Sequence, residues 1–140
     1  MRTVHFTEGA LTMLSDWEDA QVISLSGKID DVATSVVITS RKAPGELREA
    51  DALLQHRLDE RAKISRRFQV LRAPVALQKA PGATCTSQLL HDEAGMVLVN
   101  EAAFFVQDRL LSITTTGLSA GQAVVEAEAR RLLATLKFRA

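Results

Sequence analysis

The stretch Met96-Val-Leu-Val-Asn-Glu-Ala-Ala-Phe-Phe-Val-Gln-Asp-Arg-Leu-Leu-Ser-Ile-Thr-Thr-Thr116 holds two long runs of apolar and β-branched residues, separated by a short polar segment. It predicts a long β-hairpin with strands over residues 96–107 and 109–116. Shorter strand patterns precede it, at residues 3–6, 10–13, 21–25, 34–41, 68–77 and 84–90. Because consecutive strands adjoin one another without crossover helices, they predict an antiparallel sheet.

Two helices complete the predicted fold. Between residues 46 and 66, Leu47, Leu54, Leu58 and Ala62 recur on one side of a helical repeat. A capping box at residues 119–122 (Ser-x-x-Gln) predicts the start of a second helix that ends near residue 135. The expected fold class is therefore α+β: an antiparallel β-sheet with both helices packed on one face and the other face open. The 140 residues are expected to form a single domain, 1–140.

Composition excludes several classes of protein. The chain has 17 Lys and Arg against 17 Asp and Glu, so no net charge favours a nucleic-acid partner. A single cysteine excludes an internal disulfide. The longest uninterrupted apolar run, residues 102–106, is far shorter than the ~20 residues that span a bilayer, so stable membrane insertion is not expected. Because no signal-peptide pattern opens the chain, we expect a cytoplasmic protein.

Few residues offer catalytic or metal-binding chemistry. His5, His56 and His91 stand in unrelated predicted elements, and none has metal-ligand spacing with another. Cys85 lies in a strand pattern, which is typical of a buried, inert thiol. Nucleotide-binding loops and nucleophile-elbow motifs are also absent from the sequence. We therefore expect no catalytic residue, no metal site and no cofactor, and a protein that is not an enzyme.

Alternation along the strands divides the side chains between the two faces of the sheet. One set is strongly apolar and is expected to pack beneath the helices: Ile23, Leu25, Val36 and Ile38. The opposite set mixes small polar and apolar side chains and is expected to lie on the open face: Val22, Ser24, Val37 and Thr39. In the hairpin, alternation does not decide which set faces outward, and we place Asn100 and Ala102 with the open face. A plain solvent-facing sheet would show the same mixture.

Several short motifs, taken in order, carry a resemblance to a known family. They are Trp17-Glu18-Asp19, the strand Ser35-Val-Val-Ile-Thr-Ser-Arg41, Ala103-Phe-Phe-Val106, the strand Leu110-Leu-Ser-Ile-Thr114 and the closing Leu136-Lys-Phe138. This order resembles the DcrB-like family, and within it the Eag-type (effector-associated) chaperones of bacterial type VI secretion. The resemblance covers nearly the whole chain.

The resemblance implies a DcrB/PsbP-like fold, a homodimer and a chaperone function in the cytoplasm. The implied partner is the hydrophobic N-terminal transmembrane segment of a PAAR-domain effector, Rhs-type effectors included, which is shielded until the effector is loaded onto the VgrG spike. The implied binding surface is the sheet face that carries Val22, Ser24, Val37, Thr39, Asn100 and Ala102. Two alternatives stay open: a PsbP/DcrB-like small-ligand or protein-binding module without a chaperone role, and an enzyme whose site is assembled from distant residues.

Overall fold

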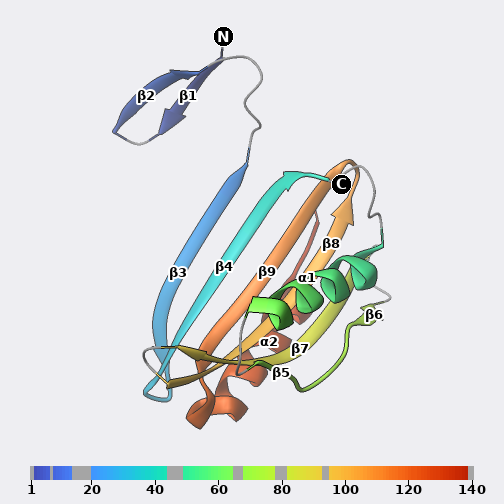
Figure 1. The fold of residues 1–140 in the computed structure, drawn as a ribbon. Coiled ribbons are helices and arrows are strands. Elements are labelled where there is room, and N and C mark those ends of the chain that lie inside the picture. The colour runs from blue at the N-terminus through green and yellow to red at the C-terminus, as the bar shows by residue number, and fades with distance from the viewer. Residues whose placement is uncertain are drawn as a thin grey trace.

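The computed structural model describes residues 2–6, 8–13, 20–43, 49–64, 68–77, 82–92 and 95–138 of the chain. Most of these residues lie in strands or helices (Figure 1). In chain order the elements are β1 (Arg2–Phe6), β2 (Gly9–Met13), β3 (Gln21–Ile29), β4 (Val32–Lys42), α1 (Ala50–Ile64), β5 (Phe68–Val70), β6 (Val75–Leu77), β7 (Gly82–Asp92), β8 (Gly95–Val106), β9 (Arg109–Leu118), a 3-10 turn (Ser119–Gly121) and α2 (Gln122–Thr135).

One large antiparallel sheet forms the body of the protein. Its strands lie in the order β3-β4-β9-β8-β7-β5, and β6 pairs with β7 beside β5. Strands β1 and β2 form a separate two-stranded sheet, which lies beyond the end of β3 (Figure 1). The α+β fold class and the antiparallel sheet are therefore confirmed. The predicted hairpin is the β8–β9 pair, and it turns at Gln107, whose φ is +57°.

Cross-strand register assigns every side chain of the central strands to one of two faces, because directly paired residues in an antiparallel sheet point to the same side. Val37, Thr114 and Glu101 form one row, on the side that we name the α1 face. Ile38, Ile113 and Ala102 form the next row, on the opposite side, which we name the α2 face.

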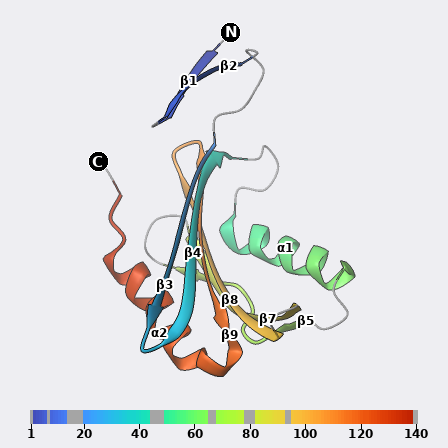
Figure 2. The ribbon, with the colours of Figure 1, turned by 90° about the vertical axis from the view of Figure 1, so that its left-hand side faces the viewer.

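Each helix covers a different face of the sheet (Figure 2). On the α1 face, α1 buries a cluster with residues of β8 and β9: Leu53, Leu54, Leu58, Ala103, Phe105 and Leu110. On the α2 face, α2 and the residues after it pack onto a second cluster: Ala102, Phe104, Ile113, Leu133, Leu136 and Phe138. The rings of Phe104 and Phe138 meet edge to face, with centroids 5.5 Å apart. The expectation that both helices share one face is therefore wrong.

The physical reason lies in β8, whose sequence is apolar on both sides. Ala102 and Phe104 point one way while Ala103 and Phe105 point the other, and all of them are buried. A continuous apolar run of this kind has to be covered on both faces of the sheet. One helix on each side satisfies that requirement, and two helices on one side would leave a row of large apolar side chains in water.

The second helix begins differently from its predicted start. Ser119 lies in the 3-10 turn, and α2 begins at Gln122 without a side-chain hydrogen bond from a capping residue. The helix ends at Thr135, as expected. Its first turn packs very closely on β9, because a Cβ added at Gly117 would lie 2.5 Å from Cγ2 of the fully buried Val125. This close approach, rather than a capping box, fixes the start of α2 on the sheet.

Replacing Gly117 by alanine is predicted to lower the free energy of unfolding by about 1–3 kcal/mol, because the new methyl group overlaps Val125. Gly27 supplies a matched control, since it lies in the same cross-strand row and a Cβ there meets nothing within 4 Å. Gly27→Ala should leave stability unchanged or slightly higher. Urea denaturation of both variants measures the difference. Equal midpoints would show that α2 does not press on β9 at this point.

Candidate functional site

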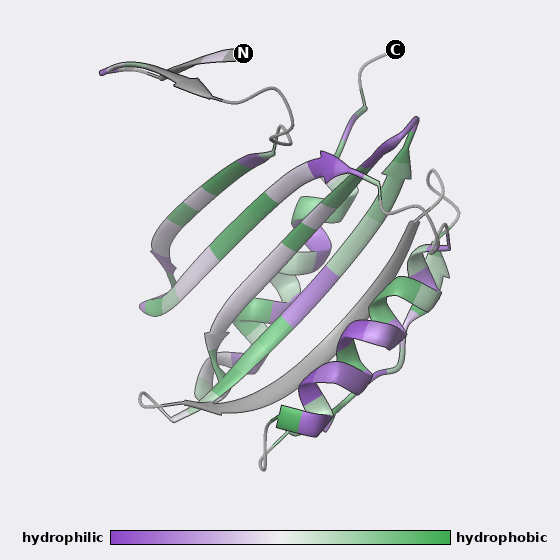
Figure 3. Cartoon of the chain, turned by 45° about the horizontal axis from the view of Figure 1, so that its top comes forward, coloured by the Kyte–Doolittle hydropathy of each residue, from purple (hydrophilic) through white to green (hydrophobic). Residues whose placement is uncertain are grey.

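Part of the α1 face has no helix over it. Helix α1 packs against β5, β6, β7 and β8, and at β9 it lies near Leu110 and Ser112. Figure 3 shows β3, β4 and β9 lying beside α1 with no helix in front of them, while α2 lies behind the sheet. We name this uncovered part the open face. Its side chains are Val22, Ser24, Ser26, Ser35, Val37, Thr39, Thr114 and Thr116.

The central rows of the open face are uncharged, and Lys28 and Arg41 lie at its two ends. Between these two ends, every side chain named above is a valine, a serine or a threonine, and none of them is fully buried. Surfaces that only meet water usually carry charged side chains at about a quarter to a third of their positions. A surface of small hydroxyl and branched apolar groups instead matches what lies between closely packed helices in membranes. The central rows of the open face therefore combine small hydroxyl groups with branched apolar side chains.

The dimensions of the open face are those of one helix. Strands lie about 4.8 Å apart, so β3, β4 and β9 together present a strip roughly 14 Å wide. The 9 residues of β3, at about 3.3 Å each, give a length of roughly 30 Å. A helix with its side chains is about 10–12 Å across, and a helix of 20 residues is about 30 Å long. One membrane-spanning helix therefore fits the strip along its whole length.

A shallow depression lies at the end of the open face near the β3–β4 turn. Its volume is about 270 Å³, and Ser26, Ser35 and Thr116 line it beside Val97 of β8. The turn itself consists of Asp30 and Asp31, which have φ values of +49° and +63°. This tight turn keeps β3 and β4 paired as far as Ile29 and Val32, so the strip extends beyond the predicted end of β3 at Leu25.

The structure divides the predicted binding residues between the two faces. Val22, Ser24, Val37 and Thr39 lie together on the open face, as expected. Asn100 and Ala102 lie on the α2 face and are only 5% and 4% exposed, so their placement with the open face is wrong. The reason is that β9 lies between β4 and β8. Which side chains of β8 share a face with Val37 of β4 is therefore decided by the register of β4 with β9 and of β9 with β8, and not by alternation within one strand.

Sequence analysis also missed several residues of this surface. They are Ser26, Ser35, Thr114 and Thr116. Ser26 and Ser35 are in phase with Ser24 and Val37, so strand alternation carried a signal for them. No such signal existed for the β9 threonines, because their face depends on pairing with β4.

The apolar set on the other face of β3 and β4 is only partly covered. Val36 and Ile38 pack against the α2 cluster, as expected. Ile23 and Leu25 remain 52% and 57% exposed, which contradicts the expectation that they pack beneath a helix. Helix α2 packs on β8, β9 and β4, and towards the edge strand it lines a pocket of about 300 Å³ together with Leu25 of β3. The edge strand β3 therefore exposes apolar side chains on its α2 face, and its open face carries a mixture of apolar and polar side chains.

A buried carboxylate positions α1 beside the open face. Glu101 is 2% exposed, and both Arg57 and Arg61 of α1 pair with it, Arg57 Nη1 at 3.6 Å from Oε2. Arg57 also donates a hydrogen bond to Oγ of Ser112 at 3.3 Å. Burial lowers the pKa of the Arg57 guanidinium, and the charge of Glu101 opposes that shift. These contacts hold α1 over β8 and keep it away from β3 and β4.

Three further features of the sequence concern a short motif, metal ligands and membrane-spanning helices. The Trp17-Glu18-Asp19 motif lies outside the described residues. Within the described ranges, no three His, Cys, Asp or Glu side chains come together in a group that could hold a metal ion. None of the helices in that part of the chain is long and apolar enough to cross a membrane.

Comparisons with known proteins support the fold alone. Neither a comparison with protein-family profiles nor a search of curated proteins finds a match to this sequence. Among solved structures, the chain is similar to PA94 of Pseudomonas aeruginosa, which is described as a protein of unknown function. The two align with a TM-score of 0.69 and 12% sequence identity, over 100% of this chain and 98% of the other.

Replacing Glu101 by glutamine is predicted to lower the free energy of unfolding by about 1–3 kcal/mol, because Arg57 and Arg61 lose their buried counter-charge. Glu60→Gln is the matched control, since Glu60 pairs with Lys63 on the exposed side of α1. We expect the control to leave stability nearly unchanged. Thermal unfolding followed by circular dichroism compares the two variants, and equal losses would show that the buried network does not fix α1.

Proposed function

We propose that this protein is a cytoplasmic chaperone of type VI secretion. In this proposal it shields the N-terminal transmembrane helices of a PAAR-domain effector until the effector is loaded onto the VgrG spike. The open face on β3, β4 and β9, with its uncharged central rows, is the observation that carries the proposal. The resemblance of the sequence to the Eag-type chaperones agrees with it and supplies the identity of the client.

The fit between the open face and a client helix rests on size and chemistry together. A helix of 20 apolar residues is about 30 Å long and matches the strip in both dimensions. Val22 and Val37 offer apolar contact to it, and the serine and threonine hydroxyls offer hydrogen bonds to its backbone or small polar side chains. Because the hydroxyl groups interrupt the apolar surface, the free chaperone avoids presenting one large apolar patch to water.

The energy of binding favours two copies of the chaperone around the client. Covering one side of a helix removes on the order of 300 Å² of apolar surface from water, which is worth about 7 kcal/mol. Association costs roughly 4–15 kcal/mol in lost freedom of motion, so one strip gives little net affinity. A homodimer presents two strips, so it doubles the free energy gained by burying apolar surface. The second strip contacts a client that the first already holds, so this gain supports the proposed dimer.

The exposed edge of the sheet provides a surface for the second copy. Strand β3 pairs with β4 on one side only, and Ile23 and Leu25 remain exposed on its α2 face. Long apolar edge strands are usually covered, because they otherwise promote aggregation. A second copy that covers Ile23 and Leu25 leaves Val22 and Val37, on the opposite face, free for the client.

The proposal predicts that Val22→Asp and Val37→Asp abolish client binding, because each places a carboxylate against an apolar helix. The test is co-expression with an effector fragment that carries the apolar N-terminal segment and the PAAR domain. The wild-type chain should bring the fragment into the soluble fraction and co-purify with it. Each variant should leave it insoluble, while light scattering and circular dichroism show an unchanged dimer and fold.

Val75→Asp is the matched control for Val22→Asp. Val75 is 60% exposed and Val22 is 66% exposed, but Val75 lies on β6, away from the open face. The control should solubilise the fragment as well as the wild type does. If the fragment precipitates equally with and without the wild-type chain, the chaperone proposal is wrong. If the control fails together with the open-face variants, the client does not bind at the open face.

A further inference from the structure

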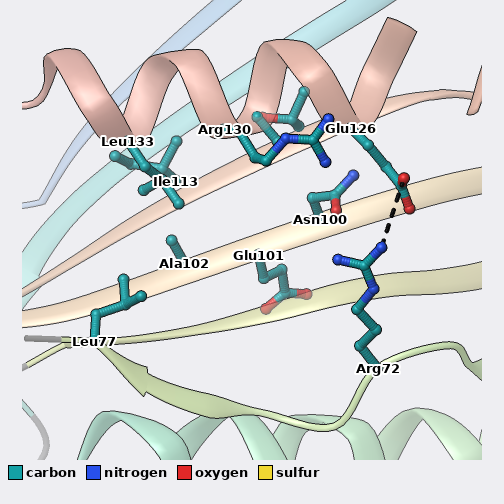
Figure 4. A pocket seen from close by; sticks show the side chains of 11 residues that line it. Arg72, Leu77, Asn100, Glu101, Ala102, Ile113, Glu126, Arg130 and Leu133 are labelled. Carbon is teal, nitrogen blue, oxygen red and sulfur yellow. Dashed lines mark ion pairs between the residues drawn. The ribbon is translucent and has the colours of Figure 1, made fainter. Parts of the chain in front are cut away.

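A second candidate site lies on the opposite side of the sheet, between α2 and the α2 face. It is a cavity of about 300 Å³ (Figure 4). Strands β8 and β9 form its floor, α2 forms its roof, and Arg72 and Leu77 close its side. A volume of this size is at the lower end of the range for small-molecule sites in proteins.

The cavity exists because two facing walls carry alanine. On α2, Glu126, Ala129, Arg130 and Leu133 lie on one side of the helix and all line the cavity. Opposite them, Ala102 lines it from β8. A larger side chain at either alanine would fill the space. The gap is therefore a property of this sequence and not of helix-on-sheet packing in general.

One end of the cavity is polar and holds a donor with no partner. Asn100 is 5% exposed, and its Nδ2 atom is buried without a hydrogen-bond partner. Figure 4 shows the amide directed from β8 toward α2, into the space that Arg130 and Glu126 border. Buried side-chain donors in proteins almost always have a partner, so an acceptor oxygen is the group that this position lacks.

The charges around this end favour an anionic acceptor. At this end of the cavity, Nη2 of Arg72 lies 3.9 Å from Oε2 of Glu126, so these two charges balance each other. The guanidinium of Arg130 then adds a positive charge on the same side. The carboxylate of Glu101 pairs with Arg57 and Arg61 of α1. The other end of the cavity is apolar, with Leu77, Ile113 and Leu133 around it.

We propose that this cavity binds a small amphipathic carboxylic acid. Its carboxylate accepts a hydrogen bond from Nδ2 of Asn100 and faces Arg130, and its apolar chain lies among Leu77, Ile113 and Leu133. A cavity of half this volume holds a benzene molecule, so about 300 Å³ accommodates a chain of roughly eight to ten carbons. The proposal does not depend on the chaperone function, because the open face lies on the other side of the sheet.

Titration of the full chain with octanoate by isothermal calorimetry tests the proposal. We expect saturable binding of one octanoate per chain, with a Kd below about 1 mM. Octan-1-ol, which has the same chain without the charge, should bind at least about tenfold more weakly. If octanoate gives no saturable binding, or if octan-1-ol binds equally well, the proposal is wrong.

Two variants and a control locate the binding. Asn100→Leu removes the donor and should weaken octanoate binding at least about tenfold. Ala129→Leu fills the cavity from α2 and should abolish binding, while Ala127→Leu, at an exposed position of the same helix, should leave it unchanged. Circular dichroism checks that each variant is folded.

If folded Ala129→Leu binds octanoate as tightly as the wild type, the ligand does not occupy this cavity. Client solubilisation should be unchanged in Ala129→Leu, so the two proposals fail independently.

Discussion

Strand β8 has no exposed face over its central residues, and the rest of the domain is arranged around that constraint. Phe104 and Phe105 point to opposite sides, so apolar surface has to be covered both above and below the sheet. Helix α1 covers one side and α2 covers the other. Among the described residues, neither helix packs over the α1 face of β3 and β4. The exposure of β3 and β4 is thus a consequence of how β8 is buried.

The two helices are held by different physical means, and each leaves a different kind of surface. The buried carboxylate of Glu101 holds α1 over β8 through Arg57 and Arg61, which leaves a flat strip uncovered beside the helix. Shape holds α2, through the close contact of Val125 with Gly117, and Ala129 then leaves a cavity beneath the helix that opens on one side. A flat strip suits another polypeptide, and a concave cavity suits a small molecule.

Local signals in the sequence were sufficient for the strands, the antiparallel sheet and the alternation within β3 and β4. The apolar run around Phe104 and Phe105 also carried information that both faces are buried, but not which helix covers which face. Asn100 could not be placed, because its face depends on two registers in series, β4 with β9 and β9 with β8. Strand register of this kind is set by tertiary contacts. The alternation of side chains along β8 is the same whether Asn100 faces α1 or α2, so it does not decide between the two faces.

The two candidate sites share the strands between them. Thr114 lies on the open face, while its neighbours Ile113 and Thr115 line the cavity on the other side. A ligand that shifts β9 from beneath α2 therefore also displaces part of the surface proposed for the client. If ligand and client prefer different positions of β9, each weakens the binding of the other by the same factor, as thermodynamic linkage requires.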